Sequence, residues 1–188
     1  MKPHDVLPLV SIVMLCAAAC TPTEAPESGT AFSYDETVLT AATPWTSENF
    51  QNDPDEFQFV IIGDRTGGAN AQGTFGLAVD QLNLLQPEFV INVGDVIEGY
   101  SDDAAELNAE WDEFDQLLAP LEMPFFRTPG NHDIANETAA EVWRARHGAT
   151  YYHFVYKDVL FLVLNSEDTP REAPEGIKEK LELYNRLQ

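Results

Sequence analysis

Basic residues and cysteine are both scarce in this sequence. Its 188 residues include 10 lysines and arginines against 32 aspartates and glutamates, a formal net charge of −22. Nucleic-acid-binding proteins neutralise phosphates with clustered lysine and arginine, so this charge argues against a nucleic-acid partner. The only cysteines, Cys16 and Cys20, lie near the start of the chain and provide no framework of disulfide bonds. Hydrophobic residues, in contrast, make up 44% of the chain, which is enough for a buried core and excludes wholesale disorder.

A long hydrophobic run is also lacking. The apolar stretch from Val6 to Ala19 is too short to span a bilayer. Because Lys2 precedes it and small residues end it, the stretch is typical of a secretory signal peptide, which we expect over residues 1–19. The alternative, an N-terminal core helix, is disfavoured by two prolines, Pro3 and Pro8.

The residues before Cys20 resemble a bacterial lipobox, in which small residues precede a cysteine that becomes the lipidated first residue of the mature protein. This resemblance implies that Cys20 is acylated and that the acyl chains attach the protein to a membrane. Thr21 follows the cysteine in place of aspartate, which in such signals is typical of the outer membrane. The sequence therefore predicts an exported protein of the bacterial cell envelope, outer-membrane-anchored or periplasmic.

Residues 20–44 are expected to lead from the lipidated cysteine to a domain over residues 45–188. The first part of this lead-in is acidic and polar, with too little apolar surface to fold by itself. Aromatic residues recur from Phe32 to Phe50, so the second part is expected to pack against the domain.

Strands and helices are expected to alternate through the domain. Short apolar runs predict strands, and apolar residues at helical spacing predict helices. The expected strands are 57–62, 89–93, 125–128, 151–156 and 159–165, and the expected helices are 75–86, 101–119 and one that begins at 176. The acids between residues 102 and 115 are expected to form the solvated face of the second helix. This order predicts an α/β fold with a largely parallel first sheet.

Polar side chains follow three of the expected strands. Asp64 follows the first strand, Asp95 follows the second, and Asn131 and His132 follow the third, each group next to a glycine. In a parallel sheet, ligands gather at the carboxyl ends of the strands. Carboxylates that converge there without nearby Lys or Arg repel one another, and a divalent cation relieves the repulsion. Each group alone is as well explained by a turn or a helix cap, but together they predict a metal site.

Three sequence blocks resemble the first signature blocks of the calcineurin-like metallophosphoesterases. The blocks are Gly63-Asp64, Gly94-Asp95-Val96-Ile97-Glu98 and Gly130-Asn131-His132-Asp133. The resemblance extends over about residues 45–188 and implies an αββα sandwich with a two-metal site at the edge of a sheet. It also leads us to expect that the chain holds the N-terminal part of such a domain and is incomplete at its C-terminus.

The resemblance implies a role for each matching residue. Asp64 would bind the first metal ion, Asp95 would bridge both ions, and Asn131 would bind the second through its side-chain oxygen. His132 would face the substrate and assist the leaving oxygen, supported by Glu98. The implied reaction is in-line attack on a small phosphomonoester or phosphodiester by a metal-bound hydroxide, with two cations about 3.5–4 Å apart. Mn, Fe, Zn and Mg suit these donors comparably, so the identity of the metal stays open.

The sequence departs from the family pattern at Thr66, where the family has a metal-binding histidine, and in lacking the family's later histidine block. Of the remaining histidines, His4 lies in the signal, His147 is expected to cap a helix end, and His153 is expected to be a paired surface residue of a strand. These departures leave a second hypothesis open. The chain would then be a non-catalytic envelope lipoprotein that uses the same fold as an interaction module, or an inactive fragment.

Arg65 is the only lysine or arginine between Lys2 and Arg127. One interpretation of Arg65 is an ion pair with one of the many acids. The other is a ligand for the substrate phosphate, because a guanidinium binds phosphate with two parallel hydrogen bonds. Backbone N–H groups of Gly67 and Gly68 would then add donors for the same anion. The sequence leaves both interpretations open.

Overall fold

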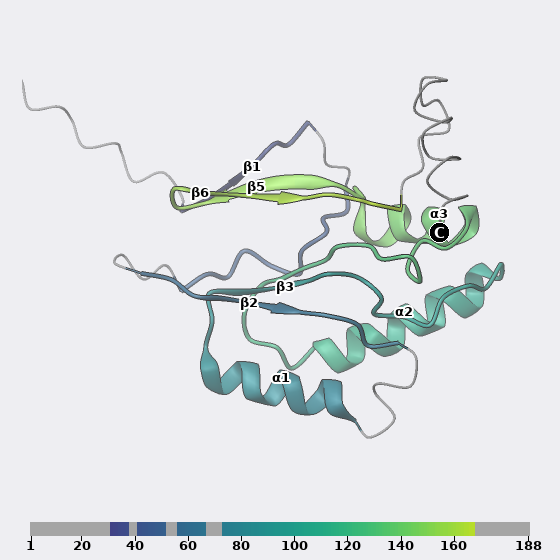
Figure 1. Ribbon diagram of the computed structural model, residues 1–188, viewed down its shortest axis with the longest axis horizontal. Helices are drawn as coiled ribbons and strands as arrows, with labels where there is room; N and C mark the ends of the chain where they lie inside the picture. The colour runs from purple at the N-terminus through teal and green to yellow at the C-terminus, as the bar shows by residue number, and fades with distance from the viewer. Residues whose placement is uncertain (1–30, 38–40, 52–55, 67–72, 168–188) are drawn as a thin grey trace, which may run out of the picture.

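The computed structural model describes residues 31–37, 41–51, 56–66 and 73–167 (Figure 1). The expected signal peptide, the lipidated Cys20, Gly67 and Gly68, and the helix expected from residue 176 lie outside the described residues. Within those ranges, none of the helices has the length and apolar character that crossing a membrane requires.

The described part of the chain contains six strands, which form two stacked sheets, and three helices (Figure 1). In chain order they are β1 (Phe32–Tyr34), β2 (Phe59–Ile62), α1 (Thr74–Leu85), β3 (Phe89–Asn92), α2 (Ala104–Leu118), β4 (Phe125–Phe126), α3 (Glu137–His147), β5 (Tyr152–Tyr156) and β6 (Val159–Val163). The strands and helices predicted within the described ranges are therefore present, with boundaries that differ by a few residues.

The first sheet is parallel, as the alternation of strands and helices predicts, with the order β2-β3-β4. β4 has two residues instead of the expected four because the chain beyond Phe126 finds other partners. The N–H of Arg127 donates to the carbonyl of Pro44 at 2.7 Å, and the N–H of Thr128 donates to the side-chain oxygen of Asn92 at 2.7 Å. These bonds end the strand and hold the loop that follows it.

The second sheet is antiparallel, with the order β1-β5-β6. β5 and β6 form a hairpin whose turn contains Lys157, with φ of 52°, as the sequence indicated for Lys157-Asp158. β1 was not expected as a strand. It lies within the predicted lead-in 20–44, pairs Phe32 with Tyr156 of β5, and so makes part of the lead-in a component of the sheet.

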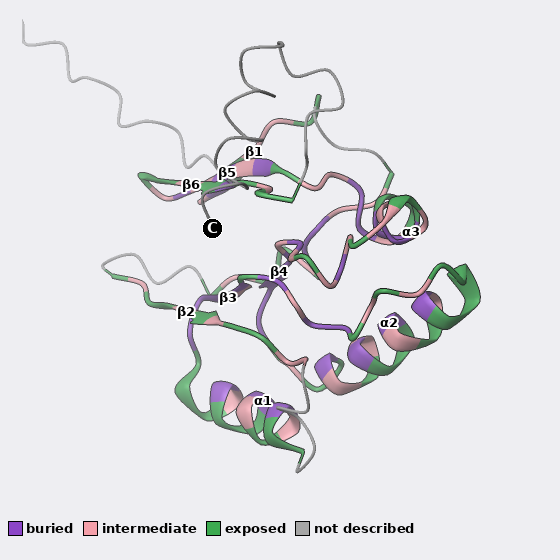
Figure 2. Cartoon of the chain, turned by 45° about the vertical axis from the view of Figure 1, so that its right-hand side comes forward, coloured by how far each residue is buried: buried purple, intermediate pink, exposed green. Residues whose placement is uncertain are grey.

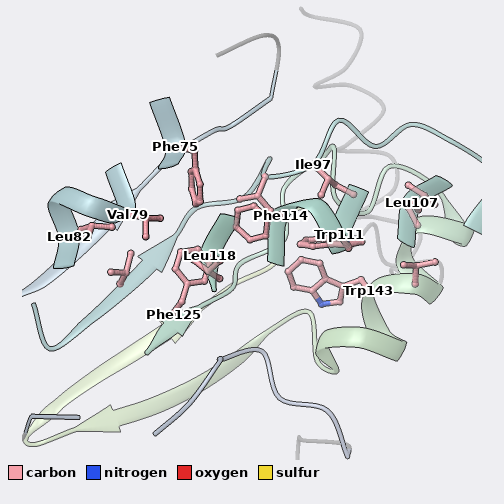
Figure 3. Close-up of a cluster of buried hydrophobic side chains, with 14 of the residues drawn as sticks. Phe75, Val79, Leu82, Ile97, Leu107, Trp111, Phe114, Leu118, Phe125 and Trp143 are labelled. Carbon is pink, nitrogen blue, oxygen red and sulfur yellow. The ribbon is translucent and has the colours of Figure 1, made fainter. Parts of the chain in front are cut away.

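One hydrophobic core lies between the parallel sheet and the helices (Figure 3). Side chains alternate along a strand, so Val90 and Phe125 point to this core while their neighbours point to the other sheet. The centre of the core is formed by rings from the two sides, with Phe114 of α2 5.9 Å from Phe125 and Trp111 5.5 Å from Trp143 of α3. α2 is thereby fixed across the strands that carry the loops described below.

A second core lies between the two sheets and is mainly aromatic. Its buried members are Phe32, Trp45, Phe89, Phe126, Tyr152, Phe154, Tyr156 and Val163. Phe126 of β4 stacks on Phe154 of β5 with ring centroids 4.2 Å apart. These contacts hold the antiparallel sheet against the inner face of the parallel one.

The outer faces of the two sheets differ. α1 and α2 cover the outer face of the parallel sheet, whereas no helix of the described part lies over that of the antiparallel sheet (Figures 1 and 2). On that face, Leu160 and Leu162 of β6 are 55% and 63% exposed. Phe161 lies between these two leucines and Val163 follows them, and both point inward to the aromatic core.

Candidate functional site

Loops from the carboxyl ends of β2, β3 and β4 meet at one edge of the parallel sheet. The backbone N–H groups of Arg65 and Thr66 donate to the carbonyl of Asp95 at 2.9 and 3.3 Å, which joins the first loop to the second. The side chain of Asn92, fully buried at the end of β3, bonds the backbone of Thr128 and joins the second loop to the third. The three sequence blocks are therefore brought together, as their positions after parallel strands predicted.

Glycine allows the second and third loops to approach with their backbones in contact. Gly94 has φ of 98°, and a Cβ atom on it would lie 2.5 Å from the Cα of Gly130. Gly99 has φ of 62°, and a Cβ atom there would overlap the carbonyl oxygen of His132. A side chain at either position would force the loops apart and also strain the backbone.

Asp133 ties these two loops together from within. Its carboxylate is buried and accepts backbone N–H bonds from Asp95 and Gly130, both at 2.8 Å, from Val96 at 3.0 Å and from Ile97 at 3.3 Å. Burial raises the pKa of Asp133 to about 6, while the four N–H donors act in the opposite direction. Sequence reasoning included Asp133 in the third block but assigned it no role; an acid directly after Asn131-His132 was the available signal.

His132 is held by its backbone and by one ring nitrogen. Its N–H donates to Oδ1 of Asp95 at 2.9 Å, and Nδ1 lies 2.6 Å from the carbonyl oxygen of Glu98. A carbonyl oxygen only accepts hydrogen bonds, so Nδ1 carries the proton and Nε2 is left for another partner. Glu98 thus contacts His132 through its main chain, and its own side chain is exposed.

Asn131 is exposed next to His132, and its amide nitrogen is already in use. Nδ2 donates to the hydroxyl of Tyr100 at 2.5 Å, which leaves Oδ1 as the atom available to a cation. The Tyr100 ring also meets the imidazole of His132 edge to face, with centroids 4.6 Å apart. Sequence reasoning missed Tyr100 because nothing in the pattern of apolar residues distinguishes a tyrosine in a polar loop.

The Arg65 side chain is only 10% exposed and is directed at α2. One terminal nitrogen forms an ion pair with Glu113, and the other donates to the carbonyl of Val96 at 2.9 Å. This is the ion-pair interpretation that the sequence had left open. The phosphate-binding interpretation of Arg65 stays a prediction.

Asp64 is exposed at the end of β2 and lines a small hollow of about 160 Å³ beside the start of α1. Ile62, Phe75 and Ala78 form most of its apolar wall. Thr66, at the position of the family histidine, is half-buried and contacts the second loop through its backbone.

The donors offered to a metal ion at this edge are oxygens. Asp64 and Asp95 supply carboxylates, and Asn131 supplies an amide oxygen. Within the ranges that the structure describes, no three His, Cys, Asp or Glu side chains are grouped as a metal site. By type, these oxygen donors suit an oxygen-preferring divalent cation that completes its shell with water or substrate oxygens, as Mg²⁺ does.

His147 and His153 lie away from this edge. α3 ends at His147 as expected, but the imidazole does not cap the helix. It is buried against Trp111 and Trp143, with ring centroids 4.5 and 5.0 Å away. Burial, followed by the charges of two nearby arginines, lowers the pKa of His147 to about 2. His153 is half-buried in β5 opposite Leu162.

The acids of α2 do more than face solvent. Asp115 accepts from Arg127 at 2.9 Å and from Arg146 at 2.8 Å, and Glu110 accepts from the N–H of Gly99 at 2.8 Å. Glu113 pairs with Arg65 of the first loop, so α2 is connected to the first loop, to the second loop and to the chain after β4. The acids of this segment are exposed or half-buried, as the predicted solvated face requires, and the same face also carries ion pairs to neighbouring elements.

Two stacked sheets, helices over the parallel one, and polar side chains gathered at its strand ends define the class of this protein as a mixed α/β sandwich of the metallophosphoesterase type. Comparison with known proteins identifies the family. The calcineurin-like phosphoesterase family matches residues 57–185, which is more than half of the chain, and the chain belongs to this family. No curated protein and no solved structure matches it.

Proposed function

We propose that this protein is a divalent-metal-dependent phosphoesterase of the cell envelope. The observation that carries the proposal is the joining of three strand-end loops, by which Asp64, Asp95, Asn131 and His132 lie on adjoining segments of backbone. Membership of the calcineurin-like phosphoesterase family supports the same reaction class.

The side chains of the site have separate proposed roles. A bound divalent cation would lower the pKa of water and offset the negative charge of a phosphoester. Asp64, Asp95 and Oδ1 of Asn131 would hold that cation. In its doubly protonated form, His132 would keep Nδ1–H on the carbonyl of Glu98 and give the proton of Nε2 to the leaving oxygen of the ester, which returns the ring to its neutral form. A second cation, as in the family resemblance, would need donors besides these side chains.

The proposed substrate is a small phosphomonoester or phosphodiester outside the cytoplasm. The charge of −22 opposes association with long nucleic acids, because an acidic surface repels a polyanion. A lipid anchor at Cys20 would keep the enzyme at a membrane surface. Replacing this residue, Cys20→Ser, should move the protein from the membrane fraction to the soluble fraction, and unchanged membrane association would remove the anchor from the proposal.

Hydrolysis of an aryl phosphate and of a bis-aryl phosphodiester by the purified chain tests the activity. We expect turnover with added Mn²⁺, loss of turnover with a chelator, and a loss of at least about a hundredfold in His132→Gln, in line with the usual contribution of a general acid. His153→Gln is the matched control, because this histidine lies in β5 away from the site. Equal activity in both variants would remove His132 from the mechanism.

A second function, a non-catalytic interaction module of the envelope, is favoured by two specific observations. Thr66 stands at the histidine position, and the described residues contain no group of three His, Cys, Asp or Glu side chains around a metal site. A cooperatively folded protein that hydrolyses neither ester with Mn²⁺, Fe²⁺, Zn²⁺ or Mg²⁺ would support this module. Metal-dependent turnover that His132→Gln abolishes would exclude it.

A further inference from the structure

We propose that Tyr100 is a positioning residue of the site, which fixes the amide of Asn131 so that Oδ1 is presented to the cation. The inference deepens the proposed function and rests on it for the identity of the ligand. Neither the family match nor the pattern of the sequence assigns any role to this tyrosine.

The first support is the pair of contacts that Tyr100 makes. Its hydroxyl accepts from Nδ2 of Asn131 at 2.5 Å, and its ring lies 4.6 Å from that of His132 at an interplanar angle of 70°. One side chain thus touches two adjacent residues of the candidate site. Tyr100 is nevertheless 60% exposed, so burial in the core does not explain its place.

The second support is the backbone that carries the ring. Tyr100 has φ of 59°, in the left-handed region that residues other than glycine seldom adopt. The flanking residues hold it there: the N–H of Gly99 donates to Glu110 of α2 at 2.8 Å, and the carbonyl of Ser101 accepts from the side chain of Asn136 at 3.0 Å. The structure therefore secures an unfavourable conformation from both sides, with the ring against Asn131 and His132.

The chemical consequence concerns the two ends of the Asn131 amide. One end is a donor that a cation repels, and the other is an oxygen that a cation binds. When the phenol accepts from Nδ2, the amide is held with its oxygen free. Without the hydroxyl, rotation about the side chain presents either end, and the population ready to bind the cation falls.

The test is Tyr100→Phe, which removes only the hydroxyl, with Tyr151→Phe as a matched control. Tyr151 is also exposed, at 56%, and lies just before β5. We expect Tyr100→Phe to raise the dissociation constant for Mn²⁺ about tenfold, the usual effect of removing a partner of a metal ligand, with an unchanged melting temperature. The side-chain amide signals of Asn131 in a ¹H–¹⁵N spectrum of the metal-free protein should shift. Tyr151→Phe should change neither quantity.

The two readouts separate this inference from the proposed function. If the wild type binds Mn²⁺ and Tyr100→Phe binds it equally well, with unchanged Asn131 signals, the positioning role is overturned. If the wild type binds no Mn²⁺, the proposed function fails, and the Asn131 signals still decide the role of Tyr100: a shift confined to Tyr100→Phe supports positioning of the amide, and no shift refutes it. A lower melting temperature in Tyr100→Phe alone, with equal Mn²⁺ affinity, would also refute it.

Discussion

The two sheets of this protein are covered to different extents. The parallel sheet has α1 and α2 on one face and the antiparallel sheet on the other, and Val90 and Phe125 in its centre are completely buried. Among the described elements, the antiparallel sheet is covered on its inner face only, and leucines of β6 are exposed on the outer one. A parallel sheet is stable mainly when both faces are covered. The candidate site is attached to the doubly covered sheet, whose central strand β3 is buried, whereas Phe59 and Ile61 of the edge strand β2 are 39% and 61% exposed.

The contrast extends to the loops at the strand ends. Those of the parallel sheet are connected by Asp133, by close glycine contacts and by ion pairs to α2. In the antiparallel sheet, a short turn through Lys157 and Asp158 joins β5 to β6. Precise placement of functional groups thus coincides with the sheet whose loops have buried polar connections.

The largest difference is expected between core positions of the two sheets. Phe125→Ala, inside the helix-covered core, should lower the free energy of unfolding by about 4 kcal/mol because it leaves a cavity. Leu162→Ala, on the outer face of the antiparallel sheet, should change it by less than about 0.5 kcal/mol. Urea unfolding followed by tryptophan fluorescence measures both. Similar losses would mean that the outer face of β6 is covered after all.

The next largest effect is expected at the buried carboxylate. In Asp133→Asn one oxygen becomes an amide NH₂ group that faces backbone donors, so we expect a loss of about 3 kcal/mol. Asp158→Asn, in the exposed hairpin turn, should be neutral within about 0.5 kcal/mol. Chemical denaturation at pH 7.5 gives both values. A neutral Asp133→Asn would show that the four N–H groups have other acceptors.

A smaller effect should appear as a dependence on pH. The pKa of His147 is about 2 in the folded state and 6.5 for an unperturbed histidine, so the unfolded chain binds a proton that the folded one excludes. The neutral histidine contributes its full stability above pH 6.5, and this stability is lost as the pH falls toward 2. Between pH 7 and pH 5 the loss should be about 2 kcal/mol.

His147→Phe keeps a ring between Trp111 and Trp143 and removes the titrating group. Unfolding free energies of both proteins between pH 5 and pH 7 isolate the contribution of His147, because the carboxylates are common to both. Equal slopes would show that His147 titrates normally in the folded state.

The smallest effect is expected at Arg65. Arg65→Gln should cost about 1 kcal/mol, because Glu113 is largely exposed and an exposed ion pair stabilises little. The same variant distinguishes the two interpretations of this residue. If Arg65 forms only a structural ion pair, kcat/KM should stay within about twofold of the wild type. If Arg65 binds the substrate phosphate, kcat/KM should fall about tenfold or more, because a charge-assisted hydrogen bond is lost.

Much of the fold follows from local sequence patterns, and the rest depends on contacts between distant residues. The strands β2, β3, β5 and β6 were predictable because apolar runs end at turn residues. β1 was not, since a three-residue strand is specified by its pairing with β5. β4 is shorter than the predicted strand 125–128 because the carbonyl of Pro44, far away in the sequence, accepts the N–H of Arg127.

The site divides in the same way. Glycine and acid blocks after strands identified Asp64, Asp95, Asn131 and His132 as neighbours, because strand order determines which loops meet. The roles of Asp133 and Tyr100 depend on where a buried carboxylate and an exposed ring lie once the loops have formed. The neutral state of His147 depends on two indoles and two arginines that no local pattern brings together.

The backbone contact between Gly94 and Gly130 has a mechanical consequence. No side chain separates these two glycines, and the carboxylate of Asp133 accepts from the N–H groups of Asp95 and Gly130, so we expect the second and third loops to move as one body. A force applied at Asn131 or His132 is transmitted through Asp133 to Val96 and Ile97, which are anchored in the helix-covered core. The site therefore resists being deformed one loop at a time, and a ligand that fits poorly must displace both loops together.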